Sequence, residues 1–131
     1  MKDGRNIEDA KTNVSKAFPA AGATAYTDAV DLVGDSFVAD NVEALIASPA
    51  LANLANTKTA TLFVQESAEA AANFTNVGLS LVVTGGASGA VADSARVRFP
   101  AGTKRYVRLG VTVEANGGDN TAASAELRLK Y

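Results

Sequence analysis

Pairs of carboxylates are the one common catalytic device that this composition allows. The 131-residue chain contains no histidine and no cysteine, which excludes imidazole bases, thiolate nucleophiles and thiolate metal ligands. Two neighbouring carboxylates can serve as general acid and base, as in glycosidases. Three pairs are close in sequence: Asp28 with Asp31, Asp35 with Asp40, and Glu66 with Glu69. Each falls in an expected loop or at a strand end, where solvated acidic residues are common, so we expect no enzymatic activity.

Metal and phosphate sites are no better supported. Asp93, Asp119 and Asn120 carry oxygen ligands of the kind that Ca²⁺ prefers, but they lack the regular acidic spacing of a calcium loop. The glycine-rich stretch 85–90 lacks both the spacing of a phosphate-binding loop and a helix after it, and it is expected to be a flexible hairpin loop. Nothing marks the remaining nucleophilic or basic candidates as activated: Ser67, Ser94 and Lys104. We therefore expect no metal and no cofactor.

Cations in the last third of the chain are the most informative group for binding. Residues 1–93 hold 5 Lys/Arg and 11 Asp/Glu, whereas residues 94–131 hold 7 and 3. If the strands expected at 95–99 and 104–114 are neighbours, their polar faces form one compact basic patch with an aromatic anchor. The patch is either a solvated face or an interface that meets an acidic surface of a neighbouring subunit. The candidate protein-interface residues are Arg96, Arg98, Arg105, Tyr106 and Arg108. Such a patch is too small to indicate nucleic-acid binding.

Strict alternation of apolar and polar residues identifies the elements that position these side chains. In 104–114, Val107, Leu109, Val111 and Val113 share one parity, which is the period of a half-buried strand. Similar runs are separated by turn residues at intervals typical of a sandwich or barrel. We expect strands at 25–32, 42–47, 59–67, 74–84, 95–99, 104–114 and 121–131. The sequence thus predicts an all-β, antiparallel β-sandwich of seven or eight strands at residues 24–131.

Residues 1–23 differ from the rest and are expected to form an N-terminal arm. Their larger apolar residues Ile7, Val14 and Phe18 are seven and four positions apart, a spacing compatible with a short helix, but Pro19 follows at once. No apolar run approaches the ~20 residues of a membrane span. Residues 1–8 also lack the apolar centre of a signal peptide. We expect a soluble protein that is made without export and does not bind membranes.

Three short motifs follow one another along the second half of the chain. Gln65-Glu66-Ser67 ends one expected strand, Phe74 opens the next, and Arg105-Tyr106-Val107-Arg108-Leu109 lies in the penultimate one, before a glycine-rich turn and an alternating last strand. In this order the chain resembles the capsid cement (decoration) proteins of tailed bacteriophages, over about residues 59–131. The polar N-terminal part departs from that pattern, because in the family the chain enters its first strand sooner.

The resemblance implies a jelly roll of about eight strands that forms a homotrimer on the outside of an icosahedral head. There it would cement neighbouring major capsid subunits as a structural protein of the virion, made in the host cytoplasm, with no catalytic residue and no cofactor. Its partners would be the major capsid protein and itself. The alternative is a carbohydrate- or receptor-binding β-sandwich module of a virion or cell surface. The absence of tryptophan and the presence of only 3 tyrosines argue against that alternative.

Overall fold

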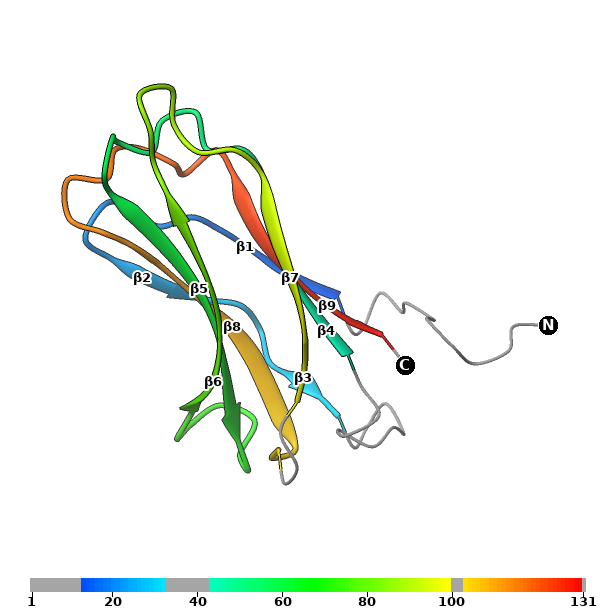
Figure 1. Ribbon diagram of the computed structural model, residues 1–131. Coiled ribbons are helices and arrows are strands. Elements are labelled where there is room, and N and C mark those ends of the chain that lie inside the picture. The colour runs from blue at the N-terminus through cyan, green and yellow to red at the C-terminus, as the bar shows by residue number, and fades with distance from the viewer. Residues whose placement is uncertain (1–12, 33–42, 100–102, 131) are drawn as a thin grey trace.

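The computed structural model describes residues 13–32, 43–99 and 103–130, and all regular structure in these segments is β-strand. The chain order of the strands is β1 (Asn13–Ala17), β2 (Thr24–Tyr26), β3 (Val30–Asp31), β4 (Glu43–Ser48), β5 (Thr59–Ser67), β6 (Thr75–Thr84), β7 (Asp93–Arg98), β8 (Tyr106–Val113) and β9 (Ser124–Lys130). Figure 1 shows them packed as two layers. In these segments no helix is long and apolar enough to cross a membrane.

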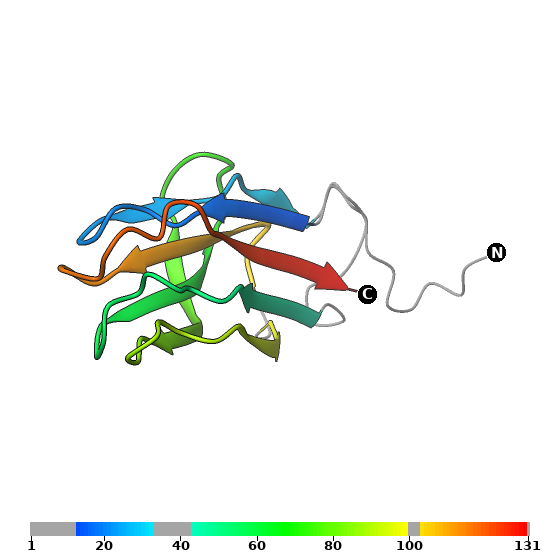
Figure 2. The ribbon, with the colours of Figure 1, turned by 90° about the horizontal axis from the view of Figure 1, so that it is seen from above.

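The two layers are antiparallel sheets with jelly-roll pairing. Sheet A has the strand order β1-β9-β4-β7, and Figure 2 shows these four strands side by side. Sheet B has the strand order β2-β8-β5-β6. The first strand pairs with the last and β4 with β7, while β5 and β6 form the innermost pair. Strands β2 and β3 both pair with β8 and act as one interrupted strand. Counted this way the fold has eight strands, so the prediction of an antiparallel sandwich is confirmed.

Most connections cross from one sheet to the other. Among the described strands, only β5 and β6 are consecutive in sequence and also paired with each other. The segments after β6 and β8 therefore join different sheets, so the glycine-rich stretch 85–90 is not the hairpin loop that the sequence suggested. The glycine-rich stretch is also held in place, because Gly85 N donates to Lys58 O at 2.8 Å and Ala90 N to Leu51 O at 2.9 Å. A Cβ at Gly89 would lie 2.2 Å from Leu51 O, so this glycine permits close backbone packing.

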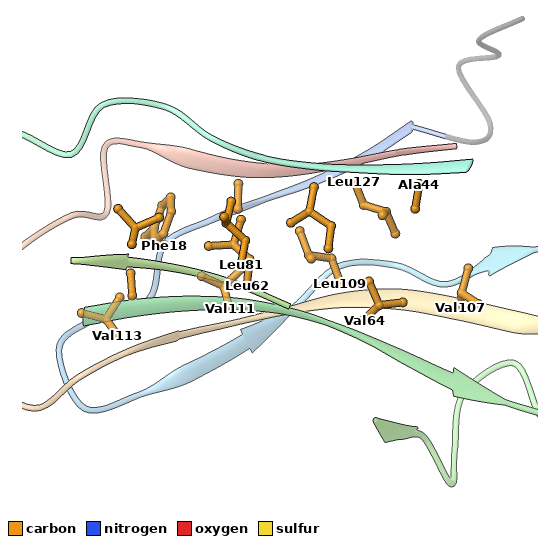
Figure 3. Close-up of a cluster of buried hydrophobic side chains, with 14 of the residues drawn as sticks. Phe18, Ala44, Leu62, Val64, Leu81, Val107, Leu109, Val111, Val113 and Leu127 are labelled. Carbon is orange, nitrogen blue, oxygen red and sulfur yellow. The ribbon is translucent and has the colours of Figure 1, made fainter. Parts of the chain in front are cut away.

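The core lies between the sheets (Figure 3). The four alternating apolar residues of β8, from Val107 to Val113, are all fully buried, and they face Ile46 of β4 together with Leu127 and Leu129 of β9. Each such side chain contributes roughly 1.5–3 kcal/mol by leaving water. The period of two in the sequence therefore identified the buried face of this strand correctly.

The sandwich begins earlier than predicted. Strand β1 pairs with β9 from Asn13 to Ala17, with Val14 opposite Leu127, and it has no helical turn. Phe18 is 1 % exposed, and its backbone N donates to Ala123 O at 3.0 Å. The assignment of residues 13–23 to an arm is therefore wrong, while residues 1–12 lie outside the described part. The strand was missed because β1 lies at the edge of its sheet and buries little of its surface, so its sequence does not alternate between apolar and polar residues.

Candidate functional site

The five predicted interface residues do not form one patch. Arg96 and Arg98 lie on β7 in sheet A, whereas Tyr106 and Arg108 lie on β8 in sheet B, with Arg105 just before it. Side chains that point outward from the two sheets point in opposite directions. The expectation that these strands are neighbours was wrong, because in a jelly roll consecutive strands mostly alternate between sheets.

The outer face of sheet A carries two ion pairs. Arg96 Nη1 lies 3.4 Å from Glu43 Oε1, and Arg128 Nη2 lies 2.8 Å from Glu126 Oε2. Arg98 is exposed on the same face, where its Cα pairs with that of Glu43. A shallow hollow of about 160 Å³ between β1 and β9 is lined by the paired Glu126 and Arg128. This face therefore carries two ion pairs and the exposed Arg98, and it has no aromatic side chain among its described residues.

Arg105 is held by the edge strand β3. Its Nε and Nη2 each donate to a different carboxylate oxygen of Asp31, both at 2.8 Å, in a bidentate ion pair. The hydrogen bond to Asp31 raises the pKa of Arg105 above its ordinary value. The guanidinium also lies 5.0 Å from the centre of the Tyr106 ring. Arg105 thus fixes β3 to β8 through a pair that is complete within the chain.

Arg108 has a different environment on the outer face of sheet B. Its guanidinium carbon lies 3.9 Å from the centre of the Tyr26 ring and 4.0 Å from that of Phe74. Nε donates to Gln65 Oε1 at 2.9 Å, and Gln65 Nε2 donates to Asn76 Oδ1 at 3.0 Å. Four segments that are far apart in sequence therefore converge on one half-buried arginine. We call Tyr26, Phe63, Gln65, Phe74, Asn76 and Arg108 the Arg108 cluster.

A glycine in the middle of β8 makes room for the aromatic part of the Arg108 cluster. Gly110 pairs with Phe63 on one side and Tyr26 on the other. A Cβ at Gly110 would lie 2.3 Å from Phe63 Cζ, so the ring covers this backbone closely. The Tyr26 and Phe63 rings meet edge to face at 6.2 Å. Tyr26 and Phe63 were not predicted as site residues, although a glycine inside an otherwise alternating strand signals such a close approach.

Carboxylates proposed as catalytic or metal candidates mostly have local partners. Asp31 binds Arg105, Glu66 accepts from Lys104 N at 2.9 Å, and Glu69 accepts from Asn73 Nδ2 at 3.1 Å. Asp28 is exposed, and Asp35 and Asp40 lie outside the described residues. Within the described segments no group of three His, Cys, Asp or Glu residues could hold a metal ion.

The three residues that were considered as calcium ligands, and judged to lack the spacing of a calcium loop, have other roles in the structure. Asp93 accepts from Ser94 N at 2.8 Å. Asp119 accepts from both the backbone N and the hydroxyl of Thr121, and the hydroxyl bond is the main reason why the pKa of Asp119 is lowered. Asn120 is buried and donates to Gly117 O at 3.2 Å. Asp119 and Asn120 therefore shape the β8–β9 connection.

Comparisons with known proteins give a likeness of fold only. No protein-family model matches the chain, and neither does any curated protein sequence. The protein in a crystal structure of PirA has 13% sequence identity to this chain, and the match covers 92% of this chain and 93% of the PirA chain with a TM-score of 0.47. A pilus protein of Bacillus endospore appendages is 13% identical over 95% and 86%, with a TM-score of 0.44. A family 16 carbohydrate-binding module is 11% identical over 89% and 71%, with a TM-score of 0.39. All three scores are below 0.5, so we draw no functional conclusion from these likenesses.

Proposed function

We propose that this chain is a structural protein of a tailed-phage virion that binds the outside of the icosahedral head as a homotrimer and cements neighbouring major capsid subunits. It would be made in the host cytoplasm, act on the exterior of the shell, and catalyse no reaction. The observation that carries the proposal is the convergence of the motif residues. Gln65, Phe74 and Arg108, which come from three separate motifs of the cement-protein resemblance, meet in the Arg108 cluster.

The jelly roll supplies what a cementing protein needs mechanically. Two sheets around one apolar core make a compact body without disulfides. A trimer of such bodies can hold several capsid subunits at once. Because linked attachment points raise the effective concentration of one another, contacts that are weak individually add to firm binding.

The test is the composition and structure of purified virions. Mass spectrometry is expected to find the chain in a fixed ratio to the major capsid protein, and cryo-electron microscopy to show threefold density of this fold on the outside of the shell. Sedimentation of the purified chain is expected to give a trimer. The absence of the chain from virions would contradict the proposal, whatever its oligomeric state.

A second function, binding of a carbohydrate or a receptor glycan, is favoured by one specific observation. The Tyr26 ring is 39% exposed, and the same sheet face carries a hollow of about 270 Å³ lined in part by Phe63, Asn76 and Gly78. Aromatic rings beside amide and hydroxyl groups suit sugar rings. Binding of the chain to arrayed glycans, lost in Tyr26→Ala and accompanied by no binding to heads, would favour this function over the first.

A further inference from the structure

The unused donor groups of Arg108 are the starting point. The rings of Tyr26 and Phe74 both lie against the guanidinium, and Gln65 occupies Nε. No acceptor among the described residues binds Nη1 or Nη2. An arginine held this way has lost side-chain freedom, yet it keeps the four N–H donors of Nη1 and Nη2 for a ligand.

The charge of Arg108 also has no counter-ion among the described residues. Arg96, Arg105 and Arg128 each form an ion pair with a carboxylate of this chain. Arg108 is half-buried, and its neighbours are a neutral amide and two rings. A partly desolvated cation with neutral neighbours favours an external anion, and a carboxylate fits the fork of a guanidinium in bidentate geometry.

The surroundings of Arg108 are those of a protein interface. Tyr26 and Val82 are 39% and 53% exposed on the outer face of sheet B, with Phe63 and Phe74 half-buried nearby. Aromatic residues and arginine are the types enriched at the centres of protein interfaces. The outer face of sheet A, in contrast, carries two complete ion pairs and Arg98, which is exposed to solvent instead of half-buried among rings.

We propose that the outer face of sheet B is the docking surface for the protein partner, and that Arg108 receives the carboxylate of an Asp or Glu side chain of that partner. The inference rests on the proposed function to the extent that the partner is a capsid subunit. It replaces the predicted five-residue patch with a surface in which Arg108 is the anchor and Arg96 and Arg98 take no part. A neutral sugar would leave the charge of Arg108 uncompensated, so a carboxylate-bearing protein segment suits the site better.

The first experiment measures binding to heads assembled without the chain. Wild type, Arg108→Gln and Arg108→Lys are compared, with Arg98→Gln as the matched control on the opposite sheet. We expect affinity about 10- to 100-fold weaker for Arg108→Gln, since truncating one partner of a buried charge pair is costly. We expect an intermediate loss for Arg108→Lys, which keeps the charge but not the planar fork, and no change for Arg98→Gln. Thermal unfolding checks that each variant is folded.

The second experiment requires neither heads nor a variant. The side-chain Nε–Hε resonances of ¹⁵N-labelled wild type are followed by NMR during titration with a capped tetraglutamate peptide, and with capped tetraglutamine at the same ionic strength. We expect the Arg108 resonance to shift saturably with tetraglutamate alone, and the Arg98 resonance to shift much less.

The outcomes separate this inference from the proposed function. Wild type that fails to bind heads contradicts the proposed function, while the NMR titration still tests the carboxylate site. Full binding of Arg108→Gln to heads overturns the docking surface. Equal shifts of Arg98 and Arg108, or binding of neutral glycans without any response to tetraglutamate, overturn the assignment of a carboxylate as the ligand.

Discussion

Replacement of Gly110 by alanine tests the close packing of the Arg108 cluster. The new Cβ would lie 2.3 and 2.4 Å from two ring carbons of Phe63, so the ring has to move away from β8 and from Tyr26. Overpacking costs about 1–3 kcal/mol. Alanine recovers about 0.4–1 kcal/mol by restricting the unfolded chain, because Gly110 does not need a positive φ. We expect Gly110→Ala to lower the free energy of unfolding by about 1–2 kcal/mol.

The effect of Gly110→Ala on the free energy of unfolding should change sign when the Phe63 ring is removed. In a Phe63→Ala background the Cβ meets no ring, and Gly110→Ala should stabilise by about 0.4–1 kcal/mol. Urea denaturation of the four proteins in this double-mutant cycle gives the coupling, expected at about 2 kcal/mol. Gly86→Ala is the control, because its Cβ would meet its nearest atom at 3.5 Å and its φ is not positive, so it should stabilise by about 0.4–1 kcal/mol in both backgrounds. Equal costs of Gly110→Ala in both backgrounds would refute the contact with Phe63.

Two further predictions concern β1 and the acidic side chains. Phe18→Ala should lower the free energy of unfolding by about 3–5 kcal/mol, because Phe18 is 1 % exposed, whereas a residue of a loose arm would change it by less than about 0.5 kcal/mol in the same urea experiment. Hydrogen bonds from Thr59, together with Lys58, lower the pKa of Glu114 from its ordinary value of 4.5. Its contribution to stability is therefore present above about pH 4.5 and is lost as the pH falls through the lower folded value. Glu114→Gln should make stability fall less steeply below pH 4.5, and urea midpoints that decline in parallel for both proteins would contradict this.

The strands were predictable wherever one face is buried along several residues. The range expected for β5 coincides with the structure, and those for β6 and β8 differ only at their ends, because burial imposes a period of two on their sequences. Strand β1 was not predictable in this way. It buries little besides Val14, and Phe18 lies beyond its end, so the two apolar residues mimic helical spacing.

The arrangement of the candidate site depended on information that the local sequence does not contain. Which strands are neighbours is decided by contacts between distant segments, and the guess that β7 and β8 are adjacent placed Arg96 beside Arg108. Of the Arg108 cluster, only Arg108 was predicted as an interface residue, whereas Gln65 and Phe74 entered only as residues of the motifs that carry the resemblance. Tyr26 could be placed near them only through the pairing of β2 with β8.

The irregular borders of sheet B have a consequence for edge-to-edge association between copies of the chain. At one border, β2 stops before β3 begins, and Thr27 fills the break by accepting from Leu109 N at 3.0 Å through its hydroxyl. At the other, β6 is kinked at Gly78, which has a φ of +85° and lies where the register with β5 shifts. Straight, open strand edges would let one copy extend the sheet of the next without limit. With both of its borders interrupted, sheet B presents no long straight edge among its described strands to which another copy could add a strand.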